Sequence, residues 1–264
     1  MVASARSGIE PVLWTVIRYW QSSEIEWDLR YRSIGFIDEG WDGEPSVGER
    51  AAATGQTRPF GYDNGYNAIS TELHVDLDTR SLYGPPEGGF RIAAHVGQHG
   101  AFGPLPKLER WVSWGGSTTL ATDVLGAHRV LGITAEAHFV TPVNGSEIPF
   151  TELVELGGTQ GLLPGYRPGH ILGYSAVGLI ADYTWPIWAF LDARLFVGTA
   201  NAFGVHLEDF DVGLLRLTFG LALGPRVPDI DLPFEFNFAF ATDTFEDGGS
   251  IDSFRLAIGA RDVL

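Results

Sequence analysis

The chain lacks cysteine and has few positively charged residues, and each of these features excludes some classes of function. Without cysteine it can form no disulfide framework, no thiolate zinc site and no cysteine nucleophile. Seventeen Lys and Arg residues stand against 33 Asp and Glu residues, which gives a net charge of −16. A chain this acidic repels the phosphates of DNA and RNA, so we expect no nucleic acid partner.

Long apolar runs are missing as well. A membrane-spanning helix needs about 20 consecutive apolar residues, and the longest run here, 185–191, is far shorter and contains Pro186. The first residues, MVASARSG, lack the apolar core of a signal peptide, so for an exported protein we expect a leader that this sequence does not include. Repeats, low-complexity tracts and linkers are absent too, which predicts one domain over 1–264.

What the sequence does contain is apolar residues at every second position, the pattern of a β-strand with two different faces. In 234–241, for example, four phenylalanines alternate with small or polar residues. No segment has the pattern of an amphipathic helix. The alternation predicts eleven strands, at about 11–20, 24–33, 69–78, 89–97, 107–122, 129–140, 172–185, 190–203, 213–224, 232–245 and 251–262.

Strand length and the polar face favour a transmembrane antiparallel β-barrel of about 12 strands (10–12), an all-β fold. A membrane strand needs about 9–11 residues, whereas strands of soluble proteins are usually about 5–6 residues long. In a membrane barrel the apolar rows face lipid and the polar rows line the lumen. A lipocalin-like barrel or a sandwich is the alternative. The polar residues that we place on the lumen wall are Glu136, His138, Asp182, Asp192, Arg194 and Arg216.

The strand connections predict an orientation. Short connections at 123–128, 186–189 and 225–231 alternate with longer ones at 34–68, 98–106, 141–171 and 204–212, as short periplasmic turns alternate with outer loops. Trp185 and Trp188 flank Pro186 at a strand end and are expected at the lipid–water interface. Eleven strands put the termini on opposite sides, although bacterial barrels usually have an even number. We therefore expect a weak strand hidden in 34–68 or a misplaced N-terminal segment.

Several motifs, in order along the chain, resemble the C-terminal part of the surface-antigen superfamily of outer-membrane assembly and translocation barrels. The resemblance covers about 77–264. Its elements are Asp78-Thr79-Arg80, a Pro and Gly turn at 85–89, Gly157-Gly158, the tip Pro164-Gly165-Tyr166, an acidic-to-Pro strand end at 182–186, and a strand at 196–203.

The resemblance implies that the long outer loop, about 141–171, folds into the lumen. In the family a tip arginine contacts an aspartate on the inner wall, but here Pro164 and Gly198 occupy those two positions. Losing both partners together leaves no unpaired buried charge. Arg167 is expected to be shielded with Tyr166 and to supply a substitute contact to Asp192 or Glu136. The alternative is that Arg167 caps a solvated loop.

The resemblance also implies a function, with two departures. Members usually carry periplasmic POTRA modules and sixteen strands, and nothing in this sequence resembles such a module, so we expect a short, barrel-only member in the bacterial outer membrane. The implied function is insertion or translocation of client outer-membrane proteins through a strand seam and the lumen loop. A passive pore or structural barrel is the alternative. Expected partners are outer-membrane lipid and lipopolysaccharide, client proteins, and a second copy of the chain where the barrel does not close alone.

The sequence gives only weak evidence for catalytic or metal-binding sites. His95 and His99 share a strand face but lie about 13 Å apart at about 3.3 Å per residue, too far to bind one metal. His74 and His138 alternate with acids and are interpreted as polar filling of the lumen. A convincing Ser-His pair is absent, so we expect no catalytic residues, no metal, no cofactor and no enzyme. The acidic runs at 208–211 and 246–247 are expected to be solvated loop charge or to bind divalent cations that bridge lipopolysaccharide.

Overall fold

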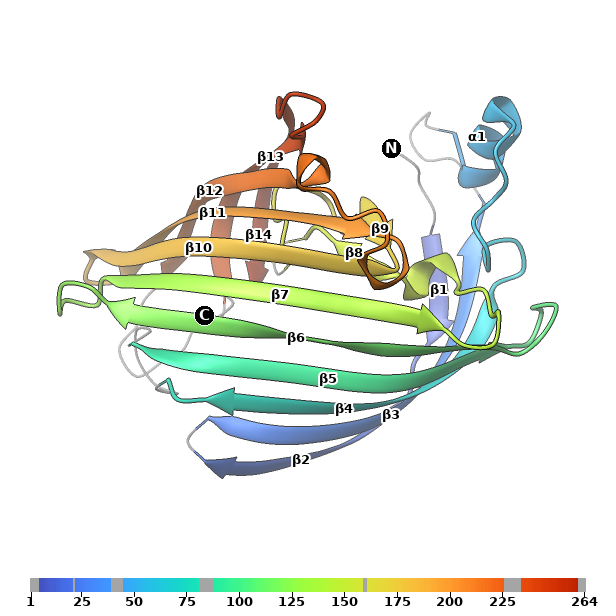
Figure 1. The fold of residues 1–264 in the computed structure, drawn as a ribbon, viewed down its shortest axis with the longest axis horizontal. Helices are drawn as coiled ribbons and strands as arrows, with labels where there is room; N and C mark the ends of the chain where they lie inside the picture. Colours follow the sequence, from blue (N-terminus) through green and yellow to red (C-terminus); the bar gives the residue numbers. More distant parts are fainter. Residues whose placement is uncertain are drawn as a thin grey trace.

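The computed structural model describes residues 5–20, 22–38, 45–80, 88–158, 161–225 and 234–260. Its main element is one antiparallel sheet that curves around an interior (Figure 1). The strands of this sheet are β1 (Ala5–Ile9), β2 (Val12–Trp20), β3 (Ser23–Ile37), β4 (Tyr66–Asp78), β5 (Gly89–Phe102), β6 (Glu109–Asp123), β7 (Val130–Pro142), β10 (Ser175–Trp188), β11 (Leu191–Phe203), β12 (Arg216–Pro225), β13 (Phe234–Thr244) and β14 (Ile251–Ala260).

The twelve strands occupy eleven positions across the wall. β1 and β2 pair one after the other with β3, as Ile9 opposite Ser33 and Val12 opposite Arg30 show. The break between them falls at Pro11, which has no N–H to donate to a ladder. From β3 onward each long strand pairs with the next. Each of the eleven predicted strands has a counterpart in the structure. β1 was not predicted, because the first predicted strand, 11–20, covers only β2.

The two faces of the sheet differ as the alternation predicts. Large apolar side chains are exposed on the outer face, among them Leu195 (50% exposed) and Leu256 (62%). The inner face carries buried polar residues such as Asp28 and Asn237. A soluble sheet would show the reverse arrangement, because exposed apolar surface on this scale is unfavourable in water. The fold is that of a transmembrane β-barrel wall, with the apolar face toward lipid.

One end of the sheet, the turn end, has the connections at 21–22, 79–88, 124–129, 189–190 and 226–233. The opposite end, the loop end, has those at 38–65, 103–108, 143–174, 204–215 and 245–250. In Figure 1 the turns after β6 and β10 are on the left, the loops after β5 and β7 are on the right, and the loop after β13 is at the top. The connection at 204–215 contains two short 3-10 helices, η2 (Val205–Leu207) and η3 (Val212–Leu214). The three long loops, at 38–65, 143–174 and 204–215, all lie at the loop end, as predicted. The connections at 103–108 and 245–250 have six residues each, fewer than the ten at 79–88, so the predicted contrast in length holds only in part.

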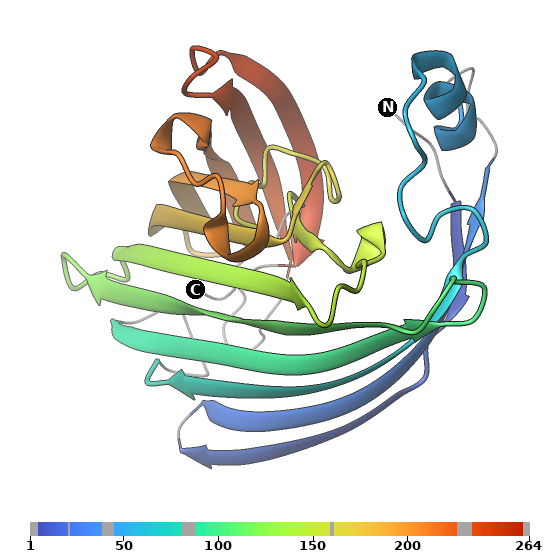
Figure 2. The same cartoon turned by 45° about the vertical axis from the view of Figure 1, so that its right-hand side comes forward.

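The loop between β3 and β4 contains a helix, α1 (Val47–Thr54), where a hidden strand was one of the two alternatives expected. The expectation of no helix was wrong as well. Ser46 and Glu49 form a capping box at its start, and Gly55 ends it with φ +69°. Figure 2 shows α1 in blue at the loop end. Among the described residues, no helix has the length and apolar character needed to cross a membrane.

The loop between β7 and β10 turns into the space that the sheet encloses, as expected (Figure 2). It contains a short 3-10 helix, η1 (Phe150–Glu152), and a small hairpin of β8 (Val154–Leu156) with β9 (Ile171–Gly173). Its apolar side chains pack on alanines of the inner wall. This cluster, the loop core, comprises Leu156, Leu162, Leu163, Tyr166, Ala176, Ala200 and Ala241. A second apolar cluster fills the loop end near β3–β7 and comprises Ile34, Tyr66, Ala68, Ala101, Trp111, Val140 and Ile148.

The two edges of the sheet run in the same direction. β2 and β14 both run from the loop end to the turn end, because eleven antiparallel positions return the chain to its starting direction. Closure within this chain would therefore need a parallel pair of edges. No hydrogen-bonded ladder joins β14 to β1 or β2 within the ranges that the structure describes.

Candidate functional site

The tip of the inward loop is built on two glycines. Gly157 (φ +108°) and Gly158 (φ +88°) adopt backbone conformations that favour glycine, and a Cβ on Gly157 would lie 2.2 Å from the carbonyl oxygen of Arg167. The Gly158 N–H donates to the carbonyl of Tyr166 at 2.9 Å, which ties the two sides of the tip together. The Gly-Gly pair noted in the sequence therefore shapes the base of the tip.

Tyr166 anchors the tip to the wall. Its side chain is 1% exposed, and its hydroxyl donates to the carbonyl of Thr242 on β13 at 2.8 Å. The same hydroxyl accepts a hydrogen bond from Nη1 of Arg216 on β12 at 2.9 Å, and the guanidinium lies 5.6 Å from the ring centre. An aromatic ring with a satisfied hydroxyl is a strong buried anchor.

The neighbouring contacts reach the edge strand itself. Ser253 on β14 donates its hydroxyl to the carbonyl of Gly165 at 2.8 Å, and Nη1 of Arg255 donates to the carbonyl of Tyr166 at 3.2 Å. A Cβ on Gly165 would lie 2.5 Å from the backbone of Phe240. Only glycine lets the tip lie this close to β13. The loop thus braces the C-terminal edge of the sheet from inside.

The predicted tip residues differ in their exposure. Pro164, Gly165 and Tyr166 are buried, whereas Arg167 is exposed. The expectation that Arg167 is shielded was therefore wrong. In the tip contacts described above, positive charge comes from the wall, through Arg216 and Arg255, and the loop supplies the hydroxyl and carbonyl oxygens. This arrangement reverses the family pattern, in which the loop supplies the arginine.

The predicted wall residues point to the interior at different heights. Arg194 on β11 forms an ion pair with the buried Glu235 on β13, and Asn237 donates to the same carboxylate at 3.1 Å. Asp192 and Asp182 are buried near the turn end. Arg216 contacts the loop tip, as described above. On β7, Nε2 of His138 lies 3.3 Å from Oε2 of Glu136.

The two predicted interfacial tryptophans lie at the turn end of β10. Trp188 is 68% exposed, and Trp185 stacks on Tyr183 with ring centres 5.5 Å apart.

Sequence reasoning missed the loop's partners on the last two strands, Thr242, Ser253 and Arg255. Their alternation with apolar residues placed Arg255 on the inner face, but the alternation cannot tell which inner residue a loop will reach. It also missed Glu235 as the partner of Arg194. The available signal was Glu235, an acidic residue between two phenylalanines. Burying its charge is unfavourable unless a cation pairs with it.

Comparisons with known proteins agree with this architecture. No protein-family model and no curated protein matches the chain. Among solved structures, it is similar to BamA from Haemophilus ducreyi lacking POTRA domains 1–3, with a TM-score of 0.60 and 16% sequence identity. The match covers 96% of this chain and 53% of that chain, so this chain spans about half the length of the matched one. The likeness confirms, at the level of fold, the barrel expected from the surface-antigen resemblance.

Proposed function

We propose that this chain, which has the fold of the BamA barrel, is an outer-membrane protein that assists insertion or translocation of other outer-membrane proteins. The observation that carries the proposal is the loop tip bound to the edge strand β14 through Ser253 and Arg255. A loop in this position links the interior of the barrel to the strand where an incoming chain would pair. The apolar outer face of the sheet supports the location in a membrane.

The mechanism rests on the chemistry of a strand edge. An edge strand presents unpaired N–H and C=O groups, and in lipid each of them raises the free energy by several kcal/mol. Pairing with another strand removes this cost. An incoming β-strand would add to this edge by backbone hydrogen bonds. Release of the tip from β14 would let the edge move, and re-docking would restore it. The client proteins, outer-membrane lipid and lipopolysaccharide are the partners this function needs.

A passive pore or structural barrel is the second candidate. Two apolar clusters and the inward loop fill much of the loop-end half of the interior, which favours a closed structural barrel. A polar cavity of about 380 Å³ near the turn end favours a path for water or ions. No enzymatic activity belongs to either proposal.

Reconstitution into liposomes tests these candidates. The full chain should accelerate folding of a client barrel relative to empty liposomes, and the double variant Ser253→Ala/Arg255→Ala, which releases the tip from β14, should change that acceleration. Arg110→Ala, an exposed arginine at the loop end, is the matched control and should leave it unchanged. Ion conductance without client acceleration would favour the pore. Neither activity would favour the structural barrel and overturn the insertase proposal.

A further inference from the structure

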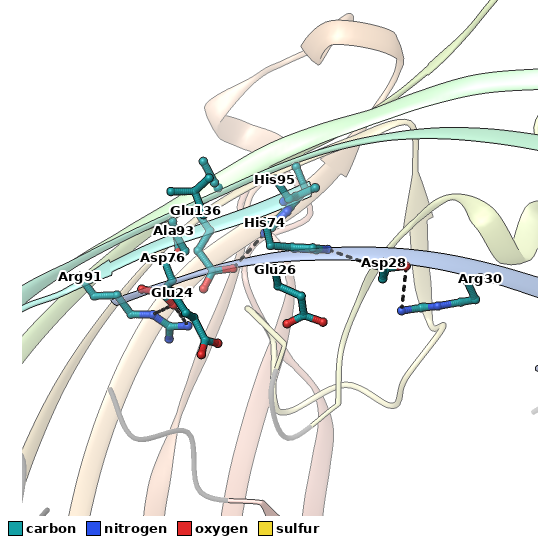
Figure 3. Close-up of a pocket in the computed structure, with 15 residues that line it drawn as sticks. Glu24, Glu26, Asp28, Arg30, His74, Asp76, Arg91, Ala93, His95 and Glu136 are labelled. Atoms are coloured by element: carbon teal, nitrogen blue, oxygen red, sulfur yellow. Dashed lines mark hydrogen bonds and ion pairs between the residues drawn. The ribbon is translucent and has the colours of Figure 1, made fainter. Parts of the chain in front are cut away.

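The interior near the turn end contains a polar cavity that the loop does not occupy. It is lined by β3 to β7 and has a volume of about 380 Å³. Figure 3 shows its charged side chains converging from β3, β4 and β5. Five of the lining residues are carboxylates and only two are arginines, the residues concerned being Glu24, Glu26, Asp28, Asp76, Glu136, Arg30 and Arg91. Such a cavity attracts cations.

Two carboxylates beside this cavity lie directly opposite each other on neighbouring strands. Asp28 on β3 is the register partner of Glu72 on β4. Like charges at directly opposite positions destabilise a sheet. Asp28 is 2% exposed, its Oδ1 has no hydrogen-bond partner, and Nη2 of Arg30 lies 3.8 Å from that oxygen. Arg30 is therefore too far from Oδ1 of Asp28 to satisfy that oxygen by a hydrogen bond.

A histidine nitrogen completes a set of three ligand atoms. Nε2 of His74 lies 3.5 Å from Oδ2 of Asp28 and 3.2 Å from Oε2 of Glu72. Ligand atoms of the three residues all lie within 4.8 Å of one another. Figure 3 shows the His74 ring directed at Asp28. One imidazole N–H can satisfy one carboxylate well but not two, so hydrogen bonding alone does not explain the arrangement.

We propose that Asp28, Glu72 and His74 bind a divalent transition-metal ion, with zinc as the best fit. Zinc takes histidine nitrogen and carboxylate oxygen at about 2.0–2.2 Å in tetrahedral geometry, which separates neighbouring ligand atoms by about 3.3 Å. The two distances from Nε2 of His74, 3.5 Å to Asp28 and 3.2 Å to Glu72, bracket that value. The side chain of His74 is 42% exposed, so an ion can enter from the cavity and keep a water at its fourth position.

The donor set distinguishes zinc from other common ions. Calcium prefers six to eight oxygen ligands and magnesium usually keeps several waters, whereas an imidazole favours zinc and its neighbours in the transition series. A bound ion would join β3 to β4, next to the edge formed by β1 and β2. This role holds whether or not the barrel inserts clients.

Metal titration of the purified full chain in detergent is the test. After chelator treatment, Zn²⁺ should bind at about one equivalent, and Co²⁺ should bind with a change in visible absorption that Zn²⁺ reverses. His74→Asn should weaken binding by about tenfold or more. His138→Asn is the control, because His138 lines the same cavity without belonging to the three ligands, and it should leave the affinity unchanged. Heat-modifiable gel migration confirms that each variant is folded.

A second measurement needs no variant. Zn²⁺ should protect His74, but not the exposed His128, from modification by diethyl pyrocarbonate, with the sites read by mass spectrometry. Absence of Zn²⁺ and Co²⁺ binding would overturn the site. Binding that survives His74→Asn and leaves His74 unprotected would overturn it too.

Discussion

Removing one oxygen atom from the loop tip should loosen the loop without unfolding the barrel. The change is Tyr166→Phe, which keeps the buried ring and deletes the hydroxyl that bonds Thr242 and Arg216. A buried donor and acceptor lose their shared partner, at a cost of about 1–3 kcal/mol. Since each 1.4 kcal/mol is tenfold, the population of the undocked loop should rise about 5- to 150-fold.

Hydrogen exchange of the loop amides measures this population. The Gly158 N–H is bonded to the Tyr166 carbonyl and the Tyr166 N–H to the Leu163 carbonyl, so both amides exchange when the tip undocks. Their exchange should accelerate by the same factor, while amides of β10 and β11 stay as they were. Tyr166→Ala, which also removes a ring that is 1% exposed, should accelerate exchange further.

The matched control is Tyr183→Phe, the same chemical change on β10. Tyr183 is directly opposite the lipid-facing Leu195 and therefore lies on the outer face, away from the loop. It should leave loop exchange unchanged. Equal protection of the tip in Tyr166→Phe and the parent would refute the argument that these two hydrogen bonds hold the loop.

Three further perturbations test other parts of the structure. Glu235→Ala leaves Arg194 unpaired in a largely buried site and should destabilise the barrel by about 3–5 kcal/mol, seen as a lower temperature for the heat-induced gel shift; an unchanged temperature would contradict the buried pair. The Gly48 backbone N–H, aided by Ser46, Tyr62 and Arg58, holds the pKa of Asp38 below its usual value. That contribution is present at neutral pH and lost as pH falls through the lowered pKa. The protection factors of the α1 amides, which correct for the pH dependence of intrinsic exchange, should therefore fall below about pH 4, and Asp38→Ala should show the low protection already at pH 7. Cysteines at Thr15 and Ser253, or in a neighbouring register, should crosslink within one chain if the barrel closes; crosslinks only between chains indicate a dimer, and none in any register contradicts the assignment of the edges.

Much of the wall could be predicted because alternation is a local property. The position of a residue in a strand decides whether it faces lipid or the lumen, so the alternation predicts the long strands β4 to β7 and β10 to β14. The short hairpin of β8 and β9 lies in the segment that was predicted as a loop. The predictions for β3, β4 and β5 stopped too early at the loop end, by three to five residues. There the inner face turns apolar, at Ile34, Tyr66 and Ala68, and the pattern of polar residues inside no longer marks the strand.

The helix α1 was missed because eight residues are too few to show a helical period. Its signals were the Ser46 and Glu49 capping box and the glycine that follows, which are specific only once a helix is suspected. The proposed metal ligands were missed for a different reason. Glu72 and His74 are neighbours on one strand face, but Asp28 joins them only through the β3–β4 register, which no single strand's sequence contains.

The docking of the loop tip also sets an order of folding events. The tip precedes its partners in the chain by 76 to 89 residues, the separations to Thr242, Ser253 and Arg255. Contacts of such long range form late, because a long segment must first be ordered. The loop tip therefore cannot dock until β13 and β14 have formed. A docked tip thus indicates that these C-terminal strands are paired in the native register.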